Sequence, residues 1–101
     1  MKEVIHQGDI IKIEKIKNPV LVTSKDFFNE SGEIIGCPIF SQKSNSPLHI
    51  YMKGHEVEGY VQCEKMALLD LNIRRFKKIE SIPVTDVINI TDAIQSIFDY
   101  I

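Results

Sequence analysis

The chain has 101 residues, a formal net charge of −2 at pH 7, and a composition that is 44% hydrophobic and 26% charged. These values fit one globular domain and exclude a disordered tail. They also argue against a protein that binds nucleic acid through overall positive charge, so any RNA or DNA site would be a local basic patch.

No segment carries the eighteen or more consecutive apolar residues of a membrane span. The first ten residues include Lys2, Glu3, His6 and Asp9 in place of an apolar signal core. We therefore expect a cytoplasmic protein that does not interact with membranes.

Only two cysteines occur, Cys37 and Cys63. They form no C-x-x-C motif, and the three histidines show no paired spacing. The sequence therefore signals neither a disulfide scaffold nor a zinc site. We expect two buried thiols, and no metal or other cofactor.

The first two predicted strands lie on either side of Asn18, the first residue of an NP dipeptide. Residues 8–16, GDIIKIEKI, alternate isoleucine with charged side chains, which predicts a half-buried strand with Ile11 and Ile13 on the buried face. Residues 19–24, PVLVTS, are apolar on both faces and predict a central strand that begins at Pro19, where proline is tolerated.

The third strand is predicted at residues 33–41, after the turn signal NESG at residues 29–32. Gly36 and Pro38 lie inside this strand and suggest a bulge or a bend there. The strand is therefore expected to deviate from a regular ladder near its middle.

Two more strands are predicted at residues 48–52, LHIYM, and 56–64, EVEGYVQCE, with a KGH turn between them. Alternation places Leu48, Ile50 and Met52 on the buried face of the first of these strands. Together with the earlier strands they predict an antiparallel meander.

An amphipathic helix is predicted after Pro83, with Thr85 as its N-cap and Asp86 in its first turn. The predicted fold is mostly β, of the α+β class: a small antiparallel β-domain closed by a C-terminal amphipathic helix. The apolar residues at helical spacing are Val87, Ile90, Ile94, Ile97 and Ile101.

Several side chains have the chemistry that RNA cleavage requires. Attack by the RNA 2′-hydroxyl needs no metal, but it needs a base, an acid, and cations or donors for the charged phosphorane. These groups would form a site if the fold brought them into one groove. The candidates are Lys15 and Lys17 before the second strand, Ser41, Gln42 and Lys43 after the third, and Asp70 ahead of the basic run RRFKK at residues 74–78.

Each candidate also has an ordinary structural interpretation. The basic run at residues 74–78 is typical of a solvated face anchored by one aromatic side chain, and a single aspartate such as Asp70 is typical of a turn. His49 is expected to be a surface or interface residue and not a catalytic base. His6 and His55 carry weaker signals still.

The segments GDII at residues 8–11, NPVLVTS at 18–24, PIFSQ at 38–42 and the stretch 59–70 are followed by the predicted helix. This order, over nearly the whole of residues 1–101, resembles the MazF/PemK family of bacterial toxin endoribonucleases. The resemblance implies a single SH3-like antiparallel β-barrel domain and a homodimer. It also implies metal-independent, sequence-selective cleavage of single-stranded mRNA through 2′-hydroxyl attack, and neutralisation by a cognate acidic antitoxin.

The family usually has an arginine before the proline of the second strand and a threonine at the end of the third, where this chain has Asn18 and Phe40. Lys17 is then expected to contact the scissile phosphate and Ser41 to donate a hydrogen bond to it. Alternation would turn Ser41 to the opposite face unless a bulge intervenes. Asp70 matches the acidic residue of some members and would be the general acid or base.

Two further differences from the family pattern are a shortened loop before the NP dipeptide, and Ala67 or Leu68 where an arginine is expected.

Two other classes of function stay open. One is a family member that binds RNA or antitoxin without cleavage. The other is a toxin that binds a protein target, as the similarly folded gyrase-poisoning toxins do, through residues 99–101. The side chains expected to bind RNA are Asn18, Gln42, Lys43, Arg74 and Arg75.

Overall fold

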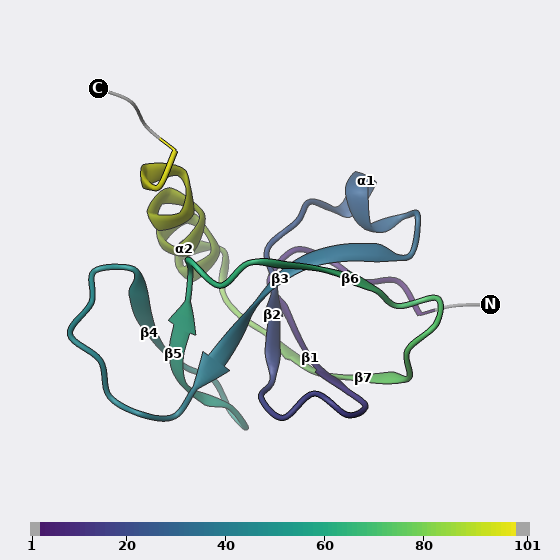
Figure 1. Ribbon diagram of the computed structural model, residues 1–101, viewed down its shortest axis with the longest axis horizontal. Helices are drawn as coiled ribbons and strands as arrows, with labels where there is room; N and C mark the ends of the chain where they lie inside the picture. The colour runs from purple at the N-terminus through teal and green to yellow at the C-terminus, as the bar shows by residue number, and fades with distance from the viewer. Residues whose placement is uncertain (1–2, 99–101) are drawn as a thin grey trace.

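A computed structural model describes residues 3–98, which form a seven-stranded antiparallel sheet and two helices (Figure 1). The expected mostly-β fold with a C-terminal helix is confirmed. The strands are β1 (Asp9–Ile13), β2 (Val20–Val22), β3 (Glu33–Phe40), β4 (His49–Lys53), β5 (Glu58–Gln62), β6 (Ala67–Asp70) and β7 (Phe76–Ser81). The helices are α1 (Asp26–Asn29) and α2 (Val84–Ser96).

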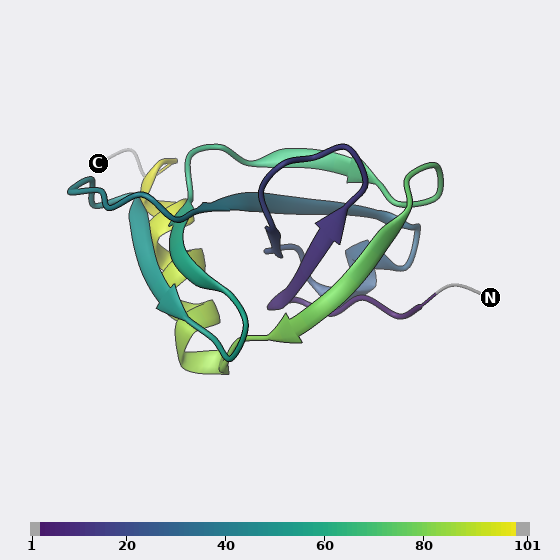
Figure 2. The same cartoon turned by 90° about the horizontal axis from the view of Figure 1, so that it is seen from below.

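The strands follow the order β4-β5-β3-β2-β1-β7, and β6 pairs with β3 off this path. The sheet curls, as the end-on view in Figure 2 shows, but β4 and β7 remain at the two ends of the path. The expected SH3-like barrel is therefore an open, curved sheet among the described strands.

The central strands are buried on both faces, as predicted for β2. Ile10 and Leu21 belong to a first core cluster that also includes Ile90 of α2. Ile11 and Val20 belong to a second cluster on the opposite face. The prediction that Ile11 is buried is confirmed, but β1 is not half-buried, because Ile10 is also fully buried on the other face.

β3 changes its partner along one edge. It pairs with β6 up to Gly36 and with β5 from Ile39, while its register with β2 runs unbroken from Gly36 to Pro38. A Cβ atom on Gly36 would lie 2.5 Å from Cγ1 of Val20 and 2.9 Å from the carbonyl oxygen of Leu21. The deviation expected near Gly36 and Pro38 is thus this change of partner.

α1, β6 and β7 do not follow from the local pattern. The predicted meander is wrong between β3 and β4, because β3 pairs with β5 and β4 lies at the end of the path beside β5. β6 pairs with β3 and β7 pairs with β1, so both ladders join distant parts of the chain. The basic run at residues 74–78 enters β7, in which Phe76 is partly buried and Lys77 is exposed. From its sequence alone, a strand with so many charged residues looks like a solvated loop, because the strand that pairs with it is not known.

α2 packs its inner face on the first core cluster. Ile90 is 1% exposed, and Val87 and Ile94 are partly buried against the same cluster, which confirms the predicted apolar face. Ile97, at the C-cap, is 38% exposed, and Ile101 lies outside the described residues. Two apolar side chains of the helix are exposed, Val84 and Ile88, and so is Phe98 just after its C-cap.

The start of α2 differs from the prediction. Pro83 occupies the N-cap with no side-chain hydrogen bond, so Thr85 lies inside the first turn together with Asp86. Proline is tolerated at this place because its φ of −62° and ψ of 154° are extended, as is typical of an N-cap residue. The prediction for Asp86 is confirmed and the prediction for Thr85 is wrong.

Both cysteines are buried free thiols, as predicted. Burial raises the pKa of Cys37 to about 12 and that of Cys63 to about 11, because the thiolate would lose its hydration. Cys37 donates a long hydrogen bond to the carbonyl oxygen of Cys63, at 3.7 Å. Both thiols therefore behave as core side chains.

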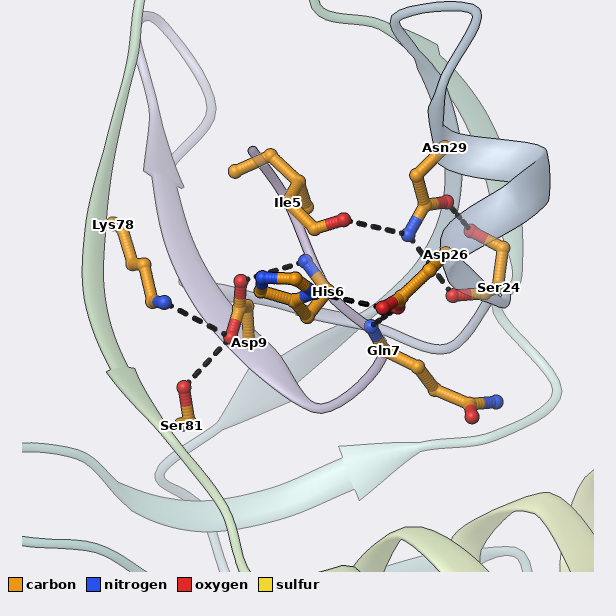
Figure 3. Close-up of polar contacts among 9 residues, drawn as sticks. All are labelled: Ile5, His6, Gln7, Asp9, Ser24, Asp26, Asn29, Lys78 and Ser81. Atoms are coloured by element: carbon orange, nitrogen blue, oxygen red, sulfur yellow. Dashed lines mark hydrogen bonds and ion pairs between the residues drawn. The ribbon is translucent and has the colours of Figure 1, made fainter. Parts of the chain in front are cut away.

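A buried carboxylate explains the GD dipeptide at the start of β1. Asp9 is 1% exposed and accepts hydrogen bonds from the His6 backbone N–H at 2.8 Å and from Oγ of Ser81 at 2.6 Å (Figure 3). Nζ of Lys78 lies 3.4 Å from the same carboxylate. Gly8 precedes it with φ of +95°, a conformation that favours glycine. The dipeptide thus ties the N-terminal segment to β7.

The same N-terminal segment is held on its other side by α1, as Figure 3 also shows. Asp26 accepts a hydrogen bond from the Gln7 backbone N–H at 2.9 Å and pairs with Nδ1 of His6 at 2.7 Å. Asn29 donates to the carbonyl oxygen of Ile5 at 3.2 Å. The short helix therefore serves to anchor residues 5–7 against the sheet.

Glu80 links the two ends of the sheet. Its carboxylate, on β7, accepts hydrogen bonds from the backbone N–H groups of His55, Glu56 and Val57 at 2.8, 2.9 and 2.8 Å, in the turn between β4 and β5. A Cβ atom on Gly54 would lie 2.5 Å from that carboxylate. Burial by itself raises the pKa of Glu80, but the three donors outweigh it and the pKa is lowered.

We expect Glu80→Gln to lower the free energy of unfolding by about 1–3 kcal/mol, because an amide presents an N–H group where an acceptor oxygen is needed. The loss should be measured by urea denaturation. Since the pKa of Glu80 is lowered from 4.5, its contribution is complete above that value and is lost as the pH falls through the folded-state pKa. The two proteins should therefore converge in acid.

Glu56→Gln is the matched control, because it removes an exposed carboxylate from the same turn. It should leave stability within about 0.5 kcal/mol of the original protein. Equal stability of the Glu80 variant and this control at neutral pH would contradict the role assigned to Glu80.

Candidate functional site

The loop between β1 and β2 meets the end of β3. Val20 is paired with Pro38, and the next backbone N–H, of Ile39, donates to the carbonyl oxygen of Pro19 at 2.9 Å. The printed pairing ends there, so Lys17 and Asn18 lie in the loop just before β2 and Ser41 lies just after β3. Figure 1 shows the loop next to the end of β3. Three predicted site residues, Lys17, Asn18 and Ser41, thus lie in two neighbouring segments.

The loop that carries Lys17 is held in a tight conformation. Lys15 has φ of +70°, which is uncommon for a residue other than glycine. Ile16 donates its backbone N–H to the carbonyl oxygen of Ile13 at 3.1 Å, and its own carbonyl accepts a hydrogen bond from Nζ of Lys12. Ile16 also packs against the second core cluster. These contacts fix the loop while Lys17 stays exposed.

The end of β3 presents the second group of predicted residues. Ser41, Gln42 and Lys43 are all exposed in the segment that follows the strand. Phe40, at the family's threonine position, is partly buried, and Nζ of Lys65 lies 4.5 Å from the centre of its ring. An aromatic ring under a cation therefore occupies the place where the family resemblance led us to expect a threonine hydroxyl.

Asp70 lies at the other end of the molecule. It is paired with Glu33, the first residue of β3, whereas Ser41 follows the last. Eight residues of strand separate these points by roughly 25 Å. Asp70 accepts a hydrogen bond from the Asn72 backbone N–H at 2.9 Å, as a turn aspartate does. The structure does not bring Asp70 to Lys17 and Ser41, and the hypothesis of one groove fails for this residue.

Arg74 and Arg75 lie beside the opposite end of the β1–β2 loop. The Glu14 backbone N–H donates to the carbonyl oxygen of Arg75 at 2.8 Å, and both arginines are exposed. β7 is the third strand from β3 in the sheet, a separation of roughly 14 Å. The arginines can therefore extend a binding surface but do not adjoin Ser41.

Exposed cations gather around this loop, and we call them the basic edge. Lys12 and Lys77 are directly opposite each other on β1 and β7, an arrangement that is unfavourable without a nearby anion. The chain as a whole is acidic, so this is the local basic patch that the sequence allowed. The basic edge consists of Lys12, Lys15, Lys17, Arg74, Arg75 and Lys77.

His49 has two hydrogen-bonding partners that the sequence did not indicate. Its Nε2 lies 2.8 Å from Oε2 of Glu64, and its Nδ1 is hydrogen-bonded to Oγ of Ser44. The hydrogen bond with His49 lowers the pKa of Glu64. The side chain of His49 is 17% exposed, which agrees with a residue near the surface. Ser44 and Glu64 carry no motif, so only the fold reveals this cluster.

A pocket of about 240 Å³ lies away from these residues. It is lined by the N-terminal segment, α1 and the turn between β6 and β7, and includes none of the predicted catalytic or RNA-binding side chains. Between residues 3 and 98 there is no group of three or more metal-binding side chains. Over the same residues, no helix is long and apolar enough to cross a membrane.

Comparison with known proteins identifies the class. The family model of the PemK-like, MazF-like toxin of type II toxin-antitoxin systems matches residues 7–98. The chain therefore belongs to this toxin family. A search of curated proteins found no match.

Solved structures agree with this family. MazE-MazF (Form-II) and MazF (Form-I) from Deinococcus radiodurans match with TM-scores of 0.88 and 0.84 at 21% and 20% identity. The matches cover 99% and 96% of this chain and 100% and 98% of those chains. An endoribonuclease in complex with its cognate antitoxin from Mycobacterial species matches with a TM-score of 0.77 at 16% identity, covering 93% of this chain and 94% of that one. At these identities the likeness establishes the fold.

Proposed function

We propose that this chain is a metal-independent endoribonuclease that cleaves single-stranded mRNA through attack of the 2′-hydroxyl. The observation that supports the proposal is the pairing of β2 with β3, because it brings the loop that carries Lys17 and Asn18 next to the segment that begins at Ser41. Membership of the toxin family and the likeness to endoribonucleases support it. The protein would act in the cytoplasm and arrest growth by destroying mRNA.

The three gathered residues have complementary roles in this proposal. Lys17 contacts the scissile phosphate as a point charge, and Asn18 adds a neutral donor where relatives carry an arginine. The Ser41 hydroxyl donates a hydrogen bond to the oxyanion that develops as the phosphorane forms. The group that carries protons to and from the reacting oxygens is not Asp70, because of its separation from Ser41.

The RNA extends from this point along the basic edge. Gln42 and Lys43 contact it beside Ser41, and Arg74 and Arg75 contact it beyond the β1–β2 loop. A positive edge on a chain of net charge −2 confines the RNA to one surface. Asn18 and Phe40 differ from the family pattern, and they favour the second candidate function, binding of RNA without cleavage.

Two protein partners belong to the same proposal. A cognate acidic antitoxin occupies the basic edge and blocks RNA by mimicking its charge, as an initially disordered segment that orders on binding. A second copy of the chain forms a homodimer. The exposed side chains of Val84 and Ile88 on α2, and of Phe98 just after it, support such a pairing because they leave apolar surface uncovered. The gyrase-poison alternative depends on residues 99–101, which lie outside the described residues.

The first test concerns cleavage. Ser41→Ala and Lys17→Ala should each slow fragmentation of a long RNA by about ten- to a thousand-fold, the range expected for losing one transition-state donor or cation. Asn18→Arg should raise the rate, because a guanidinium binds phosphate through two hydrogen bonds. Fragments ending in 2′,3′-cyclic phosphate, formed equally with EDTA present, identify the reaction.

Asp70→Asn is the control for this test, since a turn aspartate remote from Ser41 should change the rate by less than about threefold while lowering stability slightly. A hundred-fold loss in this variant would restore Asp70 to the active site. If neither the unmodified protein nor Asn18→Arg cuts any RNA, binding without cleavage replaces the nuclease function.

The second test concerns the dimer. Light scattering should give a mass of about 23 kDa, twice the 11.6 kDa of one chain. Ile88→Glu should produce a monomer, because it places a charge on the uncovered side of α2. Phe27→Glu changes an apolar residue on α1 that is even more exposed than Ile88, at 73% against 51%, and should leave the mass unchanged. If Phe27→Glu produces a monomer and Ile88→Glu does not, the dimer interface lies at α1 instead of α2.

The third test concerns the antitoxin, sought as the small acidic protein encoded next to this chain. Charge reversal at Arg74 and Arg75 should weaken its binding about ten- to a hundred-fold at low salt, because two partly desolvated contacts become repulsive. Reversal at Lys25 and Lys53, exposed cations outside the basic edge, makes the same change in net charge. Equal losses for the two double variants would show that only total charge matters.

A further inference from the structure

Three aromatic residues form a row across the β3–β5–β4 part of the sheet. Phe40 is directly opposite Tyr60 on β5, and Tyr60 is directly opposite Tyr51 on β4. Residues that are directly opposite in an antiparallel ladder share one face. Ile39 and Val61, the strand neighbours of the first two rings, are buried in the first core cluster, so the aromatic row lies on the other face.

This aromatic row is held in place but is open to solvent. The rings of Tyr51 and Tyr60 have centroids 5.4 Å apart and are tilted by 59°. The hydroxyl of Tyr51 donates to Oε2 of Glu58, which fixes the outer ring. Tyr51 is nevertheless 49% exposed, and Tyr60 and Phe40 are partly exposed. The face therefore presents ring surface that the chain itself does not bury.

The aromatic row is continuous with the proposed cleavage site. Phe40, Tyr60 and Tyr51 occupy one level on the three neighbouring strands β3, β5 and β4. Asn18 lies in the loop that leads into β2, on the other side of β3 from Tyr60. At the spacing of strands in a sheet the three rings span roughly 10 Å. Ser41 follows Phe40 directly in the chain. A phosphate held at Lys17 and Ser41 would thus lie at one end of the row.

The charged groups around the row suit a polyanion. Lys65 lies over the Phe40 ring, with Nζ 4.5 Å from its centre, and Lys43 is exposed nearby in the chain. The carboxylates on this face already have partners, since Glu58 accepts from Tyr51 and Glu64 pairs with His49. Aromatic rings bordered by exposed cations are the surroundings expected for bases joined by phosphates.

We propose that Phe40, Tyr60 and Tyr51 form a base-stacking platform for the nucleotides of single-stranded RNA that adjoin the cleaved bond. The inference rests on the proposed RNA substrate and deepens it. Sheets that bind single-stranded RNA use exposed aromatic rings in this way and stack about two or three bases. Because every base has a π-face, the platform gives affinity without requiring a particular sequence.

The platform predicts a specific salt dependence. Stacking involves no release of counterions, so removing a ring lowers affinity and leaves the slope of log affinity against log salt unchanged. Removing a cation of the basic edge lowers affinity and also makes that slope shallower. These two signatures separate the platform from the basic edge even though both contact the same RNA.

The experiment measures binding of a short single-stranded oligoribonucleotide whose 2′-hydroxyls are methylated, so that it cannot be cut. Fluorescence anisotropy at several salt concentrations gives both affinity and slope. Tyr51→Ala should weaken binding about tenfold, as expected for losing one stacked base, with no change of slope. Tyr51→Phe keeps the ring, loses the bond to Glu58, and should bind within about threefold of the original protein.

Phe27→Ala is the matched control, because Phe27 is an aromatic side chain 73% exposed on α1, far from the row. It should leave affinity unchanged, and thermal unfolding should show that every variant is folded. Lys17→Ala serves as the second reference, with weaker binding and a shallower slope.

The outcomes separate this inference from the proposed nuclease activity. Unchanged RNA affinity in folded Tyr51→Ala, alongside RNA binding by the original protein, would overturn the platform and leave the nuclease proposal standing. If Tyr51→Ala loses RNA affinity and the original protein binds RNA but does not cut it, the result would support the platform and overturn the nuclease proposal. A shift of Tyr51→Ala to a monomer with intact RNA affinity would overturn the platform and identify the row as a contact between copies.

Discussion

The change of partner along β3 is the constraint on which the rest of the structure depends. One edge of this strand stays with β2, while the other edge passes from β6 to β5 between Gly36 and Ile39. A side chain on Gly36 would collide with Val20, so the crossing point is fixed by glycine. The strand thereby joins two curved parts of one sheet. The two ends of β3 differ in role: Glu33 follows a turn, and Phe40 lies at the candidate site.

Net charge is a poor guide to what this surface binds, because the exposed cations are grouped and two of the carboxylates have partners inside the fold. Asp9 is buried against Ser81 and Lys78, and Glu80 is bound by three backbone N–H groups. These carboxylates count fully in the total charge but contribute little to the potential outside. The cations of the basic edge, by contrast, are exposed on one side. A chain with a charge of −2 can therefore present a positive surface.

The parts of the fold that could be predicted are those in which burial follows a local period. Alternation identified β1, β4 and β5, and the spacing of Val87, Ile90 and Ile94 identified α2. The sequence did not predict β6 and β7, because these strands form by pairing with segments far away in the chain and have no local pattern of their own. The same limit applies to the site. The NP dipeptide indicated where Lys17 lies, but the separation of Asp70 from Ser41 depends on pairings between distant segments.

Phe40 shows how a departure from the family pattern can be a change of role. A threonine at this position would supply a hydroxyl but little surface for a base, and a phenylalanine supplies the surface but no donor. The two functions can coexist only if a neighbouring residue provides the donor, and Ser41 is exposed directly after the strand ends. Because the chain leaves the sheet there, Ser41 is not bound by strict alternation of faces. Binding and donation can thus be divided between two adjacent residues without a bulge in β3.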